Sequence, residues 1–240
     1  MEEILNRHQR IALQVSGGRD SIACFYLLRP YLDRITVYFV NTGDAFPETL
    51  DTIRKMREIA PNFVEIDGNQ PGVIEQFGIP SDIVPVSRTP IGIIATWNDL
   101  PSIQDRYTCC MRTIMLPLHD RMVADGITLI IRGQKASDSH KAPINSGHVE
   151  NGVEYLFPID SWSTQDVMDY LRNECAPIPR FYEMLDGAAD CMTCSAWWEK
   201  GAAKYLKRYH QDAYVEVQRR LDIINQAVSG HIAHFNEEVL

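Results

Sequence analysis

Runs of apolar residues alternate with helix-like segments along the chain. Residues 11–15 (Ile-Ala-Leu-Gln-Val), 35–40 (Ile-Thr-Val-Tyr-Phe-Val) and 63–66 (Phe-Val-Glu-Ile) have the composition of strands. Residues 127–131 form a continuous apolar run of the kind found in strands that are buried on both faces. Because helix-like segments separate these runs, the pattern predicts a mostly parallel sheet with helices on both faces, a doubly wound α/β fold.

Helix signals lie between and after these runs. Ser163 followed three residues later by Asp166 is a capping-box sequence, which predicts a helix to about Asn173. Proline is favourable in a first helical turn, so the second strand should lead into a helix that begins near Pro47. The other expected helices cover residues 22–29, residues 111–124 with a kink at Pro117, and two segments within residues 196–228.

Two stretches have the composition of loops. Residues 68–101 are punctuated by Pro and Gly and show little periodicity, so we expect loops with short helices there. Residues 135–152 are polar and rich in Ser, His, Lys and Gly. This second stretch is a candidate lid that could fold over a ligand.

Length and composition narrow the class of protein. With 240 residues, 45% of them hydrophobic, the chain can bury a sizeable core, and we assign residues 1–195 to one α/β domain and residues 196–240 to a helical extension packed on it. The absence of an apolar run near 18 residues and of a charged-then-apolar leader predicts a cytoplasmic protein without a membrane span. The net charge of −9 argues against a protein that coats nucleic acid, although a local basic patch remains compatible with it.

The segment Ser-Gly-Gly-Arg-Asp-Ser at residues 16–21 joins the first strand to a helix. Its two glycines let the backbone approach a ligand closely, and the free N–H groups at the helix start favour an anion such as phosphate. Arg19 could bind phosphate oxygens, and Asp20 could cap the helix or coordinate Mg²⁺. An ordinary capped strand-to-helix turn is the alternative interpretation.

Two more polar loops should meet this segment at the carboxyl edge of the sheet, residues 41–44 and residues 132–141. They would bring the carboxylate of Asp44 and the cations Arg132, Lys135 and Lys141 to the same edge. Such a combination suits a nucleoside triphosphate or a sulfonucleotide.

Four of the six cysteines are clustered along the chain, Cys109 beside Cys110 and Cys191 three residues before Cys194. Four thiolates suit a closed zinc site or an iron–sulfur cluster. Adjacent cysteines are unusual for structural zinc and would need a kink or a helix start to face one metal centre. Buried apolar thiols at the first pair and a redox disulfide at the second are the alternatives. Cys24 and Cys175 are expected to be core thiols.

The order of these motifs resembles the phosphoadenylyl-sulfate and adenylyl-sulfate reductase family, within the PP-loop adenine nucleotide α-hydrolases. Residues 16–21 are similar to the PP-loop, with Arg19 where the family usually has Lys. Residues 41–49 (Asn-Thr-Gly-Asp-Ala-Phe-Pro-Glu-Thr) resemble the family's Asp-Thr-Gly-x-x-Phe-Pro-Glu-Thr.

The later motifs continue the same order. Cys109-Cys110-Met111-Arg112 with Pro117-Leu118 resembles the family's Cys-Cys-x-x-Arg-Lys segment and its Pro-Leu. Residues 157–167, from Phe-Pro-Ile-Asp-Ser-Trp-Ser to Asp-Val, look like its Pro-Leu-x-x-Trp-x-x-x-Asp-Val, and Cys191 with Cys194 fits its second cysteine pair. The resemblance covers about residues 11–195.

This resemblance implies a PP-loop nucleotide-binding domain over residues 1–195 that binds ATP, adenylyl sulfate (APS) or phosphoadenylyl sulfate (PAPS) with Mg²⁺. In the cluster-bearing branch, four matching cysteines hold a 4Fe-4S cluster beside the nucleotide, which carries over to Cys109, Cys110, Cys191 and Cys194. The implied nucleotide contacts are Ser16, Gly17, Gly18, Arg19, Asp20, Ser21, Gly43, Arg132 and Gly133. The implied catalytic residues are Arg19, Asp20 and Lys135.

One departure changes the expected reaction. Reductases of this family attack sulfate sulfur with a cysteine in a C-terminal Glu-Cys-Gly-x-His segment, whereas this chain has no cysteine after Cys194. The resemblance to cluster-bearing PP-loop enzymes therefore favours an ATP pyrophosphatase that adenylates an acceptor and transfers sulfur, as in transfer-RNA thiolation or DNA phosphorothioation. A sulfur-donor protein and a nucleic-acid acceptor would be its partners, and a homodimer is compatible with it.

The region after Cys194 interleaves cations with aromatic residues. This pattern suits contact with a phosphate backbone and stacked bases, or simply an amphipathic helix with a solvated basic face. The residues concerned are Trp197, Trp198, Lys200, Lys204, Tyr205, Lys207, Arg208 and Tyr209. Two other functions remain open: a sulfonucleotide reductase that uses an unrecognised or partner thiol with thioredoxin, and a nucleotide- or cluster-sensing subunit without turnover.

Overall fold

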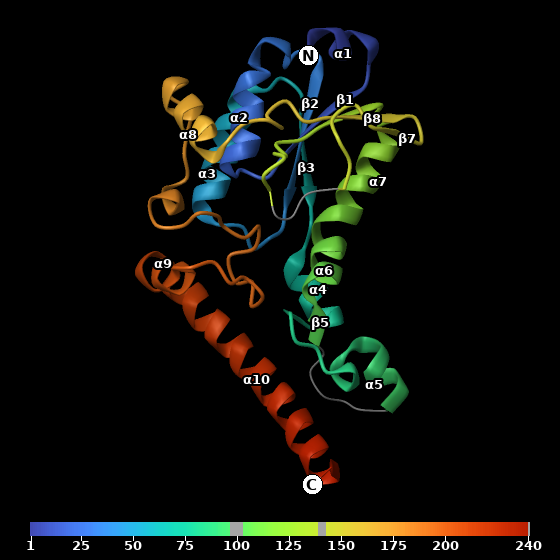
Figure 1. Cartoon of the computed structure of the whole chain (residues 1–240), viewed down its shortest axis with the longest axis vertical. Helices are drawn as coiled ribbons and strands as arrows, with labels where there is room; N and C mark the ends of the chain where they lie inside the picture. The colour runs from blue at the N-terminus through green and yellow to red at the C-terminus, as the bar shows by residue number, and fades with distance from the viewer. Residues whose placement is uncertain (97–102, 139–142, 240) are drawn as a thin grey trace. The chain divides into compact units, whose positions relative to one another are not determined.

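The computed structural model of the chain describes residues 1–96, 103–138 and 143–239 (Figure 1). Its contacts divide the chain into two compact units. The first unit holds residues 1–41, 46–67 and 117–182, and the second holds residues 42–45, 68–116 and 183–240. The helical end of the chain groups with residues 68–116 in the second unit.

The first unit is built on a six-stranded sheet in the order β3-β2-β1-β6-β8-β7. All neighbouring strands are parallel except β7 and β8. The strands are β1 (Ile11–Val15), β2 (Ile35–Asn41), β3 (Phe63–Asp67), β6 (Leu129–Ile131), β7 (Val149–Glu150) and β8 (Val153–Leu156). This arrangement confirms the predicted mostly parallel sheet.

Helices cover both faces of this sheet, with α2, α3 and α8 on one side and α7 on the other (Figure 1). The helices of the unit are α1 (Glu2–Arg7), α2 (Arg19–Leu27), α3 (Pro47–Ile59), α7 (Leu116–Ala124) and α8 (Thr164–Asn173), with the 3₁₀ turns η1 (Arg29–Tyr31) and η4 (Arg180–Glu183). Pro47 begins α3 and Ser163 caps α8, as predicted from the sequence. The helix starts therefore follow local signals.

Alternation along β1 sends its side chains into two cores. Leu13 packs with Ile22 of α2 and Leu171 of α8 in the larger core. Ala12 faces the other side, where it packs with Met122 of α7 and Ile130 of β6. A strand that is buried on both faces lacks a polar face, which explains why its sequence is a nearly continuous apolar run.

The second unit contains a two-stranded parallel sheet and most of the remaining helices. Its elements are α4 (Gln70–Phe77), β4 (Ile79–Ser81), η2 (Val86–Arg88), α5 (Pro90–Thr96), β5 (Ile103–Asp105), α6 (Arg106–Cys110), the π-helical turn η3 (Met111–Met115), α9 (Ala202–Tyr209) and α10 (Gln211–Val239). Ile79 and Ile103 of the small sheet pack against Ile224 of α10. Although α10 has 29 residues, no helix in the described part of the chain is apolar enough over a sufficient length to cross a membrane.

Three local features differ from the sequence-based expectations. The segment expected to contain only loops and short helices includes strand β4. The helix expected after Cys110 begins earlier, at Arg106, and passes through the π-helical turn before Pro117. Part of the candidate lid forms the hairpin of β7 and β8, while Ser139, His140, Lys141 and Ala142 lie outside the described residues. The strands β4, β7 and β8 are only two to four residues long, so they leave no periodic signal in the sequence and were not predicted.

The cap of α8 gives a direct test of local stability. The Ser163 hydroxyl accepts the Asp166 N–H at 3.1 Å, and the Asp166 carboxylate accepts the Ser163 N–H at 2.8 Å. We expect Ser163→Ala to lower the free energy of unfolding by about 1 kcal/mol, because the first turn loses its acceptor. Chemical denaturation measures the effect, with Thr164→Ala at the neighbouring exposed hydroxyl as the control. Equal stability of the two variants would contradict the prediction.

Candidate functional site

The turn between β1 and α2, residues 16–21, is the predicted phosphate-binding loop. Gly17 has a φ of +77°, and a Cβ atom there would lie 2.7 Å from Cγ2 of Thr49. Ser21 closes the loop, because its hydroxyl donates to the Gly18 carbonyl at 2.9 Å and accepts the Ser16 N–H at 3.2 Å. Only glycine fits at position 17, so the sequence motif reflects a real steric constraint.

The first turn of α2 presents backbone amides and a cation. Gly18 occupies the N-cap without a side-chain cap, and amides in a first helical turn lack intrahelical acceptors. The Arg19 N–H donates to the Tyr182 hydroxyl at 2.9 Å, and the Arg19 guanidinium lies 5.0 Å from the centre of the Tyr182 ring. Among the described residues this guanidinium has no carboxylate partner. It therefore remains free to bind an anion.

Lys135 lies at the same end of the sheet and is almost completely buried. Its ammonium is 2.7 Å from Asp20 Oδ1 and 2.9 Å from Asp138 Oδ1, and only 3% of its side chain is exposed. Asp138 also accepts the Lys135 N–H through Oδ2 at 2.8 Å. The structure thus brings together two residues expected at the nucleotide site, Asp20 and Lys135, and adds Asp138.

Gly133 is the point of closest approach between the loop after β6 and α2. A Cβ atom at this position would lie 2.6 Å from the backbone C and O atoms of Asp20 and 2.8 Å from the Ser21 nitrogen. The neighbouring Arg132 carbonyl accepts the Cys24 thiol at 3.7 Å, and burial lowers the pKa of the Arg132 guanidinium. Two of the three predicted loops therefore meet in the first unit, whereas Lys141 lies outside the described residues.

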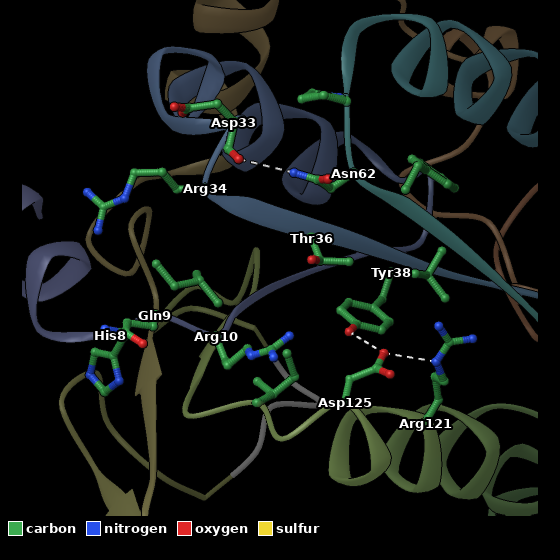
Figure 2. A pocket seen from close by; sticks show the side chains of 15 residues that line it. His8, Gln9, Arg10, Asp33, Arg34, Thr36, Tyr38, Asn62, Arg121 and Asp125 are labelled. Carbon is green, nitrogen blue, oxygen red and sulfur yellow. Dashed lines mark hydrogen bonds and ion pairs between the residues drawn. The ribbon is translucent and has the colours of Figure 1, made fainter.

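A pocket of about 740 Å³ opens at the opposite edge of the same sheet (Figure 2). Residues that precede or begin β1, β2 and β3 line it together with the C-terminal part of α7, so it lies at the amino ends of these strands. Figure 2 shows Tyr38 pointing toward Asp125, to which its hydroxyl donates at 2.6 Å, and Arg121 reaching the same carboxylate at 2.8 Å. The phosphate-binding loop follows the carboxyl end of β1, so this pocket is a separate feature.

The third predicted loop belongs to the second unit, where it contacts the loop of the second cysteine pair. The Asp44 carboxylate accepts the Thr193 N–H at 2.9 Å and the Thr193 hydroxyl at 2.6 Å. The Met192 N–H donates to the Asp44 carbonyl at 2.6 Å. Gly43, expected at the nucleotide, has a φ of +76°, and a Cβ atom there would lie 3.4 Å from Cδ of Pro71. In the second unit, Asp44 therefore holds the cysteine loop in place.

The four clustered cysteines lie within electrostatic reach of one another. Burial, followed by the nearby Cys194, raises the pKa of Cys110 to about 12. Burial likewise raises the pKa of Cys109 to about 11 and holds those of Cys191 and Cys194 above the usual range. Cys109 and Cys110 end α6 just before the π-helical turn, which matches the expected kink or helix start. All four are free thiols.

Three arginines place positive charge near this set of four cysteines. Arg112 donates to Gln104 at 2.8 Å and lies over the Phe77 ring at 3.8 Å. Arg106 donates to the Ala196 carbonyl at 3.2 Å, and Arg220 donates to the Thr193 carbonyl at 2.8 Å. These guanidinium groups lower the pKa values of Cys109, Cys110 and Cys194 against the effect of burial. They would offset the negative charge of four thiolates.

The donor set consists of thiols, the ligand type of iron–sulfur clusters and of some zinc sites. Over residues 1–96, 103–138 and 143–239, no three His, Cys, Asp or Glu side chains are arranged to hold one metal ion. A four-iron cluster binds each thiolate through a different iron, so its ligand sulfurs lie further apart than those around one ion. Four thiols with compensating arginines match such a cluster in donor type and in charge.

Several residues of these sites carried no usable sequence signal. Tyr182, Thr193 and Arg220 contact residues that are 27 to 163 positions away along the chain. Asp138 lies only three residues after Lys135 and could have been found from this spacing. Partners that lie this far apart along the chain can be identified only once the fold is known.

Comparison with known proteins agrees with this architecture. A family model described as the phosphoadenosine phosphosulfate reductase domain matches residues 10–196. The chain belongs to the phosphoadenosine phosphosulfate reductase family. An adenosine 5'-phosphosulfate reductase from Geobacillus kaustophilus is 25% identical over 195 residues, which cover 78% of this chain and 73% of the relative. One from Allochromatium vinosum is 19% identical over 218 residues, or 85% and 80% of the two chains.

A solved structure supports the fold of this reductase-family chain. The crystal structure of phosphoadenylyl-sulfate reductase from Candida auris, a phosphate complex, matches with a TM-score of 0.57 and 13% identity. The match covers 79% of this chain and 85% of that one. The predicted α/β fold is therefore confirmed, while the similarity at this identity concerns the fold alone.

Gly133→Ala tests the close approach beside the phosphate-binding loop. The added methyl group would collide with the backbone of Asp20, so we expect a loss of about 1–3 kcal/mol in unfolding free energy and weaker binding of adenine nucleotides. Calorimetric titration with ATP and with APS measures the second effect. Gly187→Ala adds the same methyl group in open space and should change neither quantity. Unchanged nucleotide binding by Gly133→Ala would contradict the prediction.

Iron uptake by the iron-free protein should increase as the pH rises. Cys109 and Cys110, with pKa values of about 11 and about 12, are protonated near neutral pH and must lose protons to bind iron. Anaerobic titration with iron and sulfide at about pH 7 and about pH 9, followed by visible absorption, measures the uptake. Cys175→Ser removes an exposed thiol outside the set and should leave the pH dependence unchanged. Uptake independent of pH would argue against thiol ligands.

Proposed function

We propose that this chain is an adenine-nucleotide-dependent sulfur-transfer enzyme that cleaves ATP between its α and β phosphates. The acceptor oxygen would form a bond to the α phosphorus, the bond from that phosphorus to the bridging oxygen would break, and pyrophosphate would leave. The observation that carries this proposal is the lack of a nucleophilic thiol at the phosphate-binding loop among the residues that the structure describes. Reduction of a sulfonucleotide needs such a thiol.

Cys24 is the nearest cysteine along the chain, and its environment does not suit a nucleophile. It is fully buried within α2, and burial together with the charge of Asp20 raises its pKa far above the usual range. Only the thiolate is nucleophilic, so a buried and protonated thiol is inert. Residues 195–240 contain no cysteine.

Contrary to the expected core position, Cys175 is exposed. It nevertheless lies at the end of the first unit that is away from the predicted phosphate-binding loop. The preceding residue, Glu174, lies 3.8 Å from Arg29, which follows the C-terminal end of α2. The phosphate-binding loop precedes the N-terminal end of the same helix. Nine residues at about 1.5 Å each place the two ends of α2 about 13 Å apart. A thiol beside Glu174 therefore cannot reach a ligand held by the first turn of α2.

The remaining loop residues suit the splitting of a triphosphate. The amides of the first turn of α2 would bind phosphate oxygens, and the unpaired Arg19 guanidinium would stabilise charge on the leaving pyrophosphate. Asp20 is fixed through Oδ1 by Lys135, which orients its carboxylate as a ligand for Mg²⁺. Mg²⁺ would neutralise phosphate charge. Lys135 is itself held between two carboxylates, so we assign it a positioning role within the catalytic set.

The cysteine set would hold a 4Fe-4S cluster through Cys109, Cys110, Cys191 and Cys194. Such a cluster supplies iron that can carry sulfur or electrons. The chain's own contribution is to fix the cysteine loop through Asp44 and to offset the negative charge through the three arginines.

Helix α9 supports a polyanionic acceptor such as nucleic acid. Tyr205 and Leu206 of this helix are buried, whereas Lys204, Lys207 and Arg208 are exposed and have no carboxylate partner among the described residues. The exposed Trp198 ring precedes the helix and donates through Nε1 to Asp82 at 3.0 Å. In a protein of net charge −9, this basic face is suited to a phosphate backbone. Because Tyr205 is buried, it is not available to stack on a base.

A sulfonucleotide reductase is the second candidate, and the adenosine 5'-phosphosulfate reductases among the relatives favour it. Without a thiol of its own at the loop, this chain would need a cysteine from a partner, with thioredoxin to complete the reduction. ATP would not be consumed in that reaction.

Release of pyrophosphate distinguishes the two candidates. We expect anaerobically prepared protein to release pyrophosphate from ATP and Mg²⁺ in the presence of an RNA or DNA acceptor, and Arg19→Ala to lower kcat/KM about 100-fold. Arg29→Ala, at the other end of α2, is the matched control and should keep full activity. A coupled pyrophosphate assay measures both.

The opposite result is equally informative. Sulfite formed from APS or PAPS with thioredoxin, without pyrophosphate from ATP, would overturn the proposal in favour of the reductase. Nucleotide binding without turnover in either assay, with activity appearing only when a partner protein is added, would indicate a sensing subunit instead.

A further inference from the structure

The loop between Cys191 and Cys194 is held from two sides by charged groups. Asp44 accepts the Thr193 N–H and hydroxyl, as described above. At the next peptide group, Arg220 of α10 donates to the Thr193 carbonyl at 2.8 Å. Thr193, one of the two residues between the cysteines, thus has both its N–H and its carbonyl bound to charged side chains.

Arg220 is a buried cation with a fixed orientation. Only 8% of the residue is exposed, and its Nε donates to Glu216 Oε1 at 2.7 Å. Hydrogen bonds from Arg219 and Arg220 hold the pKa of Glu216 at about 2, so this carboxylate is charged at neutral pH. A buried guanidinium is retained only where its donors are satisfied, and here one partner is the cysteine loop.

The positive charge of Arg220 reaches two of the four thiols. The Thr193 carbonyl that Arg220 binds is bonded directly to the Cys194 nitrogen, and Arg220 also acts electrostatically on Cys109. Cys109 lies in α6 and Cys194 in the loop of the second pair. A charge in this position therefore acts on one cysteine of each pair.

We propose that Arg220 is a positioning residue for the cysteine set, fixing the 191–194 loop through Thr193 and raising the reduction potential of the cluster held there. This inference rests on the proposed cluster. One-electron reduction adds a negative charge to the cluster, and a nearby buried cation stabilises the reduced form more than the oxidised form. Loss of the cation therefore lowers the midpoint potential.

Arg219 provides a matched control. It precedes Arg220 on α10 and binds the same carboxylate, through Nε and Nη2 at 2.7 Å each. Its side chain is exposed, and none of the cysteine pKa values depends on it. Arg219→Gln therefore removes one charge and one Glu216 partner without touching the loop.

The experiment compares Arg220→Gln, Arg220→Lys and Arg219→Gln after anaerobic loading with iron and sulfide. We expect Arg220→Gln to have a lower midpoint potential in a spectroelectrochemical titration, Arg220→Lys to restore most of the shift, and Arg219→Gln to match the parent protein. Potentials of Arg220→Gln and the parent that coincide would overturn the inference. Should Arg220→Gln bind no iron, retention of iron by Arg220→Lys supports a role of the charge, and loss in both variants overturns it.

A second measurement does not depend on iron. In the iron-free protein, amide hydrogen exchange at Thr193 should be faster in Arg220→Gln than in Arg219→Gln, because the loop loses one of its two fixed partners. If the parent protein binds no iron, the cluster proposal fails while this exchange difference still tests the positioning role. Equal exchange rates at Thr193 in the two variants would contradict the positioning role of Arg220.

Discussion

The buried ion pair between Lys135 and Asp20 is the interaction on which the carboxyl end of the first unit's sheet depends. Taking an ammonium group out of water is unfavourable unless it is paired, and Lys135 meets two carboxylates within 3 Å. The pair joins the loop after β6 to the first turn of α2, and Gly133 makes the required close approach sterically feasible. The backbone of the proposed nucleotide site is thereby fixed by the chain's own side chains.

The second unit uses the same principle with different groups. There the segment to be held is the 191–194 loop. A carboxylate and a guanidinium from distant parts of the sequence bind the N–H and the carbonyl of one residue, Thr193. Charged hydrogen bonds are stronger and more directional than neutral ones, which suits loops without regular structure. In both units, side chains from other elements position a polar loop, while the apolar cores hold the helices and strands together.

Sequence reasoning was most successful where a residue acts locally. The apolar run of β1, the Pro47 start of α3 and the capping box of Ser163 with Asp166 all act over a few residues, and the structure confirms them. The glycine loop was also recognisable, because a positive φ and a close neighbour require glycine at position 17, and a glycine is visible in the sequence. Tyr182 and Arg220 could not be predicted, since their roles arise only when distant segments pack.

The short hairpin of β7 and β8 has a consequence for the behaviour of the protein at high concentration. An exposed sheet edge can pair with the edge of another molecule and seed aggregation. Here one outer strand is two residues long and carries the exposed Glu150, and the other, β3, carries the exposed Asp67 and Glu65, the latter paired with Arg57. A very short outer strand on one side and charged side chains at both edges oppose edge-to-edge pairing between copies of the chain.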